Sequence, residues 1–255
     1  MAYDLAGALS SVYSMLIIVC VGDTLIFIST KLFRFSDVLM SDSRSRKTQI
    51  LMAAAGAVVG ILTDELSFPM LGSLGGIGHG IIVFLGIIGG PLTGIVSGAA
   101  AGGYRMSGLW WSGLGGQMNP WLAVPSAIGL FGAGILGSTL HRRLGISSHN
   151  LDGKKIAISA VATAGWRAFT IIALNSAMAP FFSYYSSVDV LLILGETILL
   201  PELIGNSVGI AVFLLVVKDI VDSGRRKDMR ARLIKKYEEY IGPVARTIAK
   251  GVDER

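Results

Sequence analysis

The chain has 255 residues, of which 52% are hydrophobic and only 15% are charged, and its mean hydropathy is +0.65. Soluble globular domains carry about a quarter of charged residues, so this composition excludes an ordinary soluble enzyme or binding domain. The net charge of +5 is concentrated, because half of the 22 basic residues follow Val217 and most of the others lie in two short loops. That distribution is typical of the positive-inside rule and not of a nucleic-acid-binding surface. We therefore predict an all-α, multi-pass bundle in the cell membrane, in contact with the lipid bilayer and with no nucleic-acid partner.

Two long apolar runs open the chain, at about Leu5–Phe33 and Gln49–Leu66. Each is long enough to cross a hydrocarbon core of about 30 Å. Four basic residues lie in or beside the loop between them: Arg34, Arg44, Arg46 and Lys47. Their charge predicts a cytoplasmic loop and therefore an external N-terminus. The single cysteine, Cys20, lies in the first run, so no intrachain disulfide can form.

Two shorter apolar pieces follow, at about Ile77–Ile88 and Leu92–Gly103, separated by Gly89-Gly90-Pro91. Each is short for a full crossing at ~1.5 Å rise per residue. The pieces are either two thin tilted spans or one re-entrant hairpin. Irregular backbone at membrane depth is tolerated only where protein or water covers it. We therefore expect this hairpin, residues 77–105, to lie in the middle of the bundle.

Glycines recur every fourth residue through the hairpin, and a further glycine precedes the turn: Gly89, Gly90, Gly94, Gly98 and Gly102. Helices in lipid associate through close packing rather than through the hydrophobic effect, and a glycine face lets two backbones approach each other. The repeat predicts a tightly packed helix face. Packing alone accounts for each glycine taken singly.

Three further spans are predicted at about Trp121–Leu140, Ile156–Ala179 and Val190–Val217. Basic residues before and after the first connecting loop predict a cytoplasmic position for it: Arg142, Arg143, Lys154 and Lys155. The next loop, Pro180–Asp189, has no positive charge and is predicted to be external. In total we expect about six membrane helices, with five to seven possible, and a cytoplasmic C-terminus.

Beyond Lys218 the chain becomes polar, and four apolar residues at helical spacing follow: Met229, Leu233, Tyr237 and Ile241. We divide the chain into a transmembrane bundle, residues 1–218, and a cytoplasmic amphipathic helix within residues 219–255. That helix either lies on the anionic inner leaflet or leads into a cytoplasmic domain, as a signalling linker or as the pairing helix of a homodimer. Both alternatives fit the pattern.

Charged residues inside the spans are candidates for a functional site, because an unpaired charge in lipid is costly. Arg105 ends the glycine face and is either an interfacial arginine or an anchor for an anionic ligand, since guanidinium binds carboxylate or phosphate bidentately. Arg167 lies near the middle of its span and implies a partner, for which Glu202 and Glu196 are the candidates. Pairing with one of these carboxylates and a role in ligand binding both remain open for Arg167.

Two more polar residues belong to the candidate ligand-binding set. Asn206 can bond across helices in the last span, and His79 lies where the hairpin begins. His79 has neither a second His nor a Cys at metal-ligand spacing, so we expect no metal site. We also expect no cofactor and no catalytic residues, because no phosphate-binding loop, nucleophile elbow or zincin motif occurs in the sequence.

Three sequence stretches resemble the five-transmembrane sensor region of LytS-type signalling proteins. They are IIGGPLTGIVSGAAAGGYR, VPSAIGLFGAGILG and LPELIGNSVGIAVFLLVVKDI. The resemblance implies a membrane receptor for a small external solute, either a small carboxylate or a cell-wall-related molecule. It places Arg105 on the family's hairpin-terminal arginine, a ligand contact, and Ser126 near small polar residues of the same site. It also implies a cytoplasmic signalling domain, a histidine kinase or cyclase, or a response regulator downstream.

The sequence departs from the family pattern at two places. Gly76-Ile77-Gly78 and then His79 stand where the family has Asn-x-Arg, and Arg167 stands where an acidic residue is often found. Either Arg167 replaces the missing cation in an anion site or the ligand differs. No kinase sequence follows the tail helix, so whether an enzyme is attached stays open.

A different class of function is also compatible with the composition. Small-solute binding subunits of energy-coupling transporters are compact bundles of about six helices. The basic tail with its apolar stripe favours the receptor, because a transport subunit does not require a signalling helix. A membrane enzyme lacks any suitable residue cluster.

Overall fold

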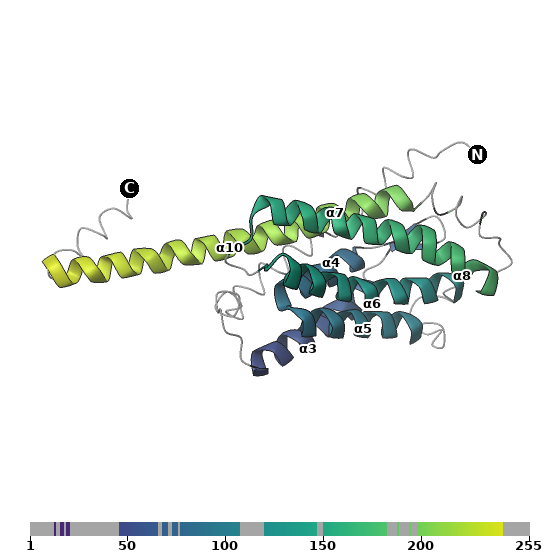
Figure 1. Cartoon of the computed structure of the whole chain (residues 1–255), viewed down its shortest axis with the longest axis horizontal. Coiled ribbons are helices and arrows are strands. Elements are labelled where there is room, and N and C mark those ends of the chain that lie inside the picture. Colours follow the sequence, from purple (N-terminus) through teal and green to yellow (C-terminus); the bar gives the residue numbers. More distant parts are fainter. Residues whose placement is uncertain are drawn as a thin grey trace.

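The computed structural model describes Tyr13, Leu16, Ile17, Val19 and Cys20, then residues 46–65, 68–70, 73–75, 77–107, 120–146, 150–182, 188, 194 and 198–241. Most of the predicted first span therefore lies outside the described residues, as does Glu196. The described helices run along one common direction (Figure 1). They are α3 (Arg46–Glu65), α4 (Gly78–Gly89), α5 (Pro91–Ser107), α6 (Pro120–Arg143), α7 (Gly153–Phe169), α8 (Asn175–Phe182) and α10 (Leu199–Ile241).

Three stretches are long and apolar enough to cross a membrane: Ala123–Arg143, Gly153–Met178 and Leu199–Tyr237. The second runs through α7, a π-helical turn η1 (Thr170–Leu174) and α8 as one rod. Helix α4 is a shorter apolar helix. These elements confirm the predicted all-α membrane bundle, with one addition. An antiparallel ribbon of β1 (Phe68–Met70) and β2 (Ser73–Gly75), which the sequence analysis missed, precedes the hairpin.

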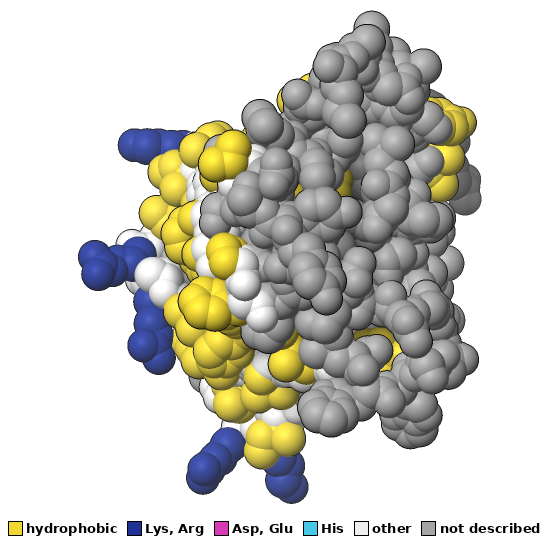
Figure 2. Space-filling view, turned by 90° about the vertical axis from the view of Figure 1, so that its right-hand side faces the viewer, with side chains coloured by type: hydrophobic (Ala, Val, Ile, Leu, Met, Phe, Trp, Pro, Cys, Tyr) yellow, Lys and Arg dark blue, Asp and Glu magenta, His cyan; other side chains and the backbone are white. Residues whose placement is uncertain are grey.

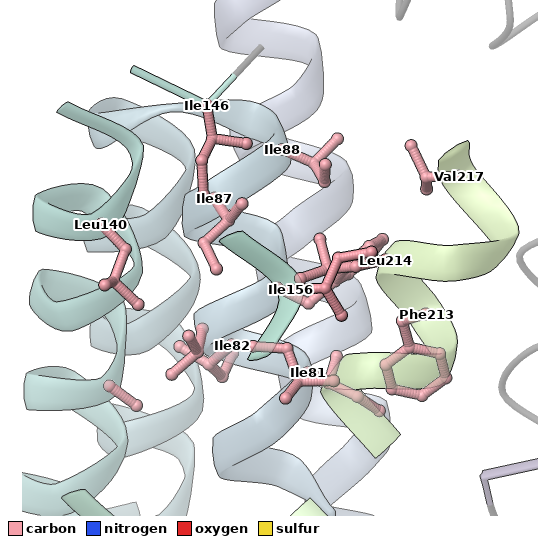
Figure 3. Packing of buried hydrophobic residues seen from close by; sticks show 14 of the residues in the cluster. Ile81, Ile82, Ile87, Ile88, Leu140, Ile146, Ile156, Phe213, Leu214 and Val217 are labelled. Carbon is pink, nitrogen blue, oxygen red and sulfur yellow. The ribbon is translucent and has the colours of Figure 1, made fainter. Parts of the chain in front are cut away.

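Helix α4 lies in the centre of the bundle. Its sequence is apolar on every side, which is typical of a helix surrounded by others, and its residues from Ile81 to Phe84 are buried. Figure 3 shows Ile81 and Ile88 of α4 near Phe213 and Val217 of α10, while Leu140 of α6 lies on the other side. The predicted central position of the hairpin is therefore confirmed for its first arm.

The turn of the hairpin is fastened to α6. Gly90 ends α4 with φ of 84°, a conformation that favours glycine. Pro91 has no N–H, so it cannot donate to the carbonyl of Ile87 four residues earlier. His141 Nδ1 lies 2.7 Å from that oxygen and donates to it instead. Ser138 Oγ shares its single proton between the carbonyl of Gly134 in its own helix, at 2.7 Å, and the carbonyl of Pro91, at 3.2 Å. The main bond from α6 to the helix break is therefore that of His141, and Ser138 adds a weaker one.

The predicted glycine face is a close contact between α5 and α6. A Cβ added at Gly94, Gly98 or Gly102 would lie 2.7, 2.8 or 2.7 Å from a backbone oxygen of α6. Real Cβ atoms do not approach oxygen so closely, so any larger residue would push the helices apart. The neighbouring face of α5 contacts α3, where a Cβ on Gly60 would lie 3.0 Å from the oxygen of Ser97.

The hairpin runs beside most of α6. Gly102 packs against Ala127 near the start of α6, and Gly90 lies against His141 near its end. Helix α6 rises about 21 Å between Ala127 and His141, at ~1.5 Å per residue. The turn is therefore level with the end of a spanning helix. This favours two crossing arms over a shallow re-entrant loop.

Helix α10 continues out of the bundle as one unbroken helix of 43 residues. Val217 and Val221 are each only 1% exposed, whereas Met229, Leu233 and Tyr237 are more than half exposed. Figure 1 shows the helix running straight past the end of the bundle, which we call the exit end. The predicted tail helix is thus a direct extension of the last span, up to Ile241, and not a separate element.

The flank of the bundle is hydrophobic. Exposed large apolar side chains lie on several helices, among them Leu51, Leu92, Phe131, Val161 and Phe169. In Figure 2, which looks along the long axis, hydrophobic side chains gather on the described flank and Lys and Arg side chains project only beyond its edge. Such a surface suits contact with lipid chains.

Candidate functional site

A buried ion pair joins α7 to α10. Arg167 Nε lies 2.9 Å from Glu202 Oε2, and the two side chains are 10% and 0% exposed. Burial of both groups away from water is costly unless they are paired and hydrogen-bonded. The predicted pairing of Arg167 with a glutamate is therefore confirmed, with Glu202 as the partner.

Asn206 lies one turn beyond Glu202 on α10 and links that carboxylate to α4. Its Nδ2 donates to Glu202 Oε2 at 2.8 Å and to the carbonyl of Glu202 at 2.9 Å. Its Oδ1 accepts the backbone N–H of Gly80 at 2.7 Å. The first N–H groups of a helix have no partner within the helix, and Ile77, at the N-cap position, has no polar side chain to supply one. Asn206 therefore caps α4 from a neighbouring helix.

His79 precedes Gly80 and contacts the same ion pair. Its Nε2 lies 3.4 Å from Arg167 Nη1, and the residue is 3% exposed. Guanidinium carries only donors, so Nε2 is the acceptor of this long contact and the ring proton lies on Nδ1. Helix α6 approaches this ring closely, because a Cβ added to Gly129 would lie 2.8 Å from His79 Nε2.

These hydrogen bonds form a closed ring that joins three helices, α4, α7 and α10. We call the set of His79, Gly80, Arg167, Glu202 and Asn206 the polar ring. Helix α4 contributes the adjacent residues His79 and Gly80, and α7 contributes Arg167. Helix α10 contributes Glu202 and Asn206, which lie one turn apart. The ring brings together four of the predicted ligand-binding residues.

The π-helical turn η1 follows α7 and begins three residues after Arg167. Thr170 Oγ1 donates to the carbonyl of Arg167 at 2.8 Å and lies 3.4 Å from its Nη1. Asn175 Nδ2 donates to the carbonyls of Thr170 and Ile171 at 2.9 and 3.2 Å, which supports the widened turn. Such turns are frequent at functional sites. The sequence analysis predicted neither this turn nor a role for Thr170 and Asn175. The available signal was Thr170, a polar residue three positions after Arg167 and therefore on the same helix face.

Arg105 lies in the last turn of α5, at the end of the bundle opposite the exit end (Figure 1). It is 9% exposed and continues the buried row of Thr93, Ser97 and Ala101. A snorkelling arginine extends its head group into water, so this burial disfavours the purely interfacial alternative. Helix α6 contacts both this end of α5 and the polar ring, because Ala127 packs against Gly102 of α5 and Gly129, two residues later, lies against His79. The end of α5 that carries Arg105 and the polar ring therefore contact the same turn of α6.

Two predicted site residues remain, Ser126 and Glu196, and the structure describes only Ser126. Ser126 is partly buried and precedes Ala127, whose carbonyl packs against Gly102, so it lies near the same end of α5 as Arg105. Glu196 lies outside the described residues. Within the described part of the chain, no three His, Cys, Asp or Glu side chains gather as a metal site would require.

A protein-family model described as "5TMR of 5TMR-LYT" matches residues 31–220, which include α3 to α8 and most of the part of α10 inside the bundle. No curated protein and no solved structure matches the chain.

Proposed function

The chain belongs to the five-transmembrane sensor regions of LytS-type signalling proteins, and we propose that it binds a small external anion and signals through α10. The ligand class that we propose is a small carboxylate or a cell-wall-related molecule carrying one. The end of the bundle that carries Arg105 would face the outside, and the exit end would face the cytoplasm.

The burial of Arg105 is the observation that carries this proposal. A guanidinium group held inside the bundle suits a planar anion that accepts two parallel hydrogen bonds. Ser126, near the same end of α5, supplies a hydroxyl that can donate to such a ligand. We propose Arg105 as the primary contact and Ser126 as a second one.

The polar ring has a different part in this proposal. The side chains of Glu202 and Asn206 already form hydrogen bonds with each other, and they also bond Arg167 and Gly80 respectively. We therefore assign Arg167, Glu202 and Asn206 to the framework of the site, and we place His79 between the framework and the ligand. The role of Glu196 stays a prediction.

A transport subunit is the competing function. The continuous helix α10 favours the receptor, because about 20 of its residues extend beyond Val221 as a rigid rod at ~1.5 Å per residue. A helix that lay flat on the inner leaflet would have to bend at the exit end, and Figure 1 shows α10 continuing straight. A solute-binding subunit has no use for such a rod.

Titration with a panel of small mono- and dicarboxylates tests the proposal, by calorimetry or thermal shift on the purified protein. We expect Arg105→Ala to weaken binding by roughly 1.5–3 kcal/mol, or about tenfold to 150-fold, through loss of charge-assisted hydrogen bonds. Arg143→Ala, which removes an exposed arginine at the exit end, is the matched control and should bind like wild type. A carboxylate that binds wild type and Arg105→Ala equally well would contradict the proposed site.

A further inference from the structure

The polar ring is the place where the buried site and the output helix share hydrogen bonds. Its two members on α10 are Glu202 and Asn206, and the latter holds the first turn of α4. We infer that Asn206 is a positioning residue that fixes α10 against α4, so that a displacement of α4 or α7 at the site moves the exposed part of α10. This inference rests on the proposed receptor function.

The bonds of Asn206 define one position of α10. Its Oδ1 accepts a hydrogen bond from the N–H of Gly80, and its Nδ2 donates to two oxygens of Glu202. A slide of α10 by one residue, about 1.5 Å, or a turn by one position, about 100°, would separate Asn206 from Gly80. The donor of Gly80 and the acceptor of Asn206 would then be buried without each other, which apolar surroundings penalise.

Close packing at Gly80 makes this contact intolerant of small adjustments. A Cβ on Gly80 would lie 2.9 Å from the carbonyl oxygen of Asn206. The α10 backbone therefore touches the α4 backbone where the hydrogen bond is made. Packed interfaces of this kind change between discrete arrangements rather than deforming continuously.

Helix α10 can carry such a change to its far end. It is one helix from Leu199 to Ile241, and its last fully buried residue is Val221. Tyr237 lies about 46 Å along the axis from Asn206, at ~1.5 Å per residue. A rotation or slide at the polar ring is therefore transmitted to the exposed segment, whereas a flexible connection would absorb it.

Distance measurement between two spin labels tests the inference without any ligand. The full chain, with Cys20→Ser, carries labels at Arg143→Cys on α6 and Lys227→Cys on α10, and it is reconstituted in lipid nanodiscs. Both labelled positions are exposed. The variant is Asn206→Ala. The matched control is Ser207→Ala, because the hydroxyl of the neighbouring Ser207 donates within its own helix, to the carbonyl of Leu203.

We expect Asn206→Ala to broaden the distance distribution or to shift its mean by about 3 Å or more, on the order of two residue rises, and Ser207→Ala to leave it unchanged. A folded Asn206→Ala protein with the wild-type distribution would overturn the inference, even if its melting temperature fell, because the residue would then be structural only.

If Asn206→Ala does not fold, Asn206→Ser decides the question. Serine keeps a polar group at this position of α10, but its shorter side chain has one hydroxyl in place of the separate amide donor and acceptor, so it cannot keep both the bond to Glu202 and the bond from Gly80. A shifted or broadened distribution supports the inference and an unchanged one overturns it. The carboxylate titration is independent of this result, so failure of the positioning role and failure of the ligand site can be told apart.

Discussion

The ion pair between Arg167 and Glu202 lies inside a bundle whose other buried side chains are mostly apolar. Glu202 is fully buried, and its Oε2 accepts from both Arg167 Nε and Asn206 Nδ2. Two donors on one carboxylate offset much of the cost of removing it from water. The cost returns in full when one partner is removed, because the other charge remains buried.

At the residue scale we therefore expect Arg167→Ala to destabilise the protein by about 3–5 kcal/mol, as the loss of one member of a buried pair does. A double variant, Arg167→Met with Glu202→Leu, should recover much of that loss, because neither charge remains. Thermal unfolding in detergent measures both, and Arg143→Ala, which alters an exposed arginine, is the control. An Arg167→Ala protein as stable as wild type would mean that Glu202 does not depend on this pair.

Among the elements, the hairpin packs against α6 at very short distances. Glycines on α5 and α6 meet backbone to backbone, and His141 and Ser138 hold the turn. The glycine repeat answers a physical need, since helices in lipid gain little from the hydrophobic effect and must approach closely to gain packing energy. Arg105 is positioned by this contact, because it ends the same helix.

Substitution along α5 separates this packing from helix propensity. Gly98→Leu should destabilise the protein by about 1–3 kcal/mol or more, since its first side-chain carbon would already lie 2.8 Å from the oxygen of Leu130. Gly103→Leu makes the same chemical change on the same helix, but nothing lies within 4 Å of its Cβ position. We expect Gly103→Leu to leave the thermal stability in detergent unchanged. Equal effects of the two changes would contradict the close-packing account.

Local signals in the sequence predict some of these elements and not others. The Gly-Gly-Pro turn, the four-residue glycine spacing and a lone arginine in an apolar span each have a short-range physical cause, and they predicted the hairpin, its packing and the pairing of Arg167. The bond from Gly80 to Asn206 joins residues 126 positions apart. It depends on how α10 stands against α4, which no local pattern encodes. The π-helical turn likewise depends on the Asn175 side chain and the surrounding packing.

At the scale of the whole molecule, most basic residues of the described part of the chain lie at one end, Arg105 and the buried Arg167 being exceptions. Figure 1 shows that three bundle helices have an end at the exit end, namely the start of α3, the end of α6 and the start of α7. These three helix ends carry Arg46, Lys47, Arg142, Arg143, Lys154 and Lys155, and the exposed part of α10 continues from the same end. By the positive-inside rule we predict that this end is cytoplasmic. Arg105, at the other end, would then be reached from outside.

Cysteine labelling in intact cells tests this orientation. In a Cys20→Ser background, Ser148→Cys, whose position in the sequence is between α6 and α7, should react with a membrane-impermeant maleimide only after the cells are opened. Labelling of Ser148→Cys from outside would reverse the topology, and with it the proposed external access to Arg105.

The central claim is that binding at the Arg105 end changes the position of α10. The most direct measurement is the distance between spin labels at Arg143→Cys and Lys227→Cys, in nanodiscs, with and without the carboxylate that stabilises the wild-type protein most. We predict a ligand-dependent change in the distance distribution that Arg105→Ala abolishes at the same ligand concentration. A carboxylate that saturates the site and leaves the distribution unchanged, while it accumulates in proteoliposomes containing the protein, would contradict the receptor and favour a transport subunit.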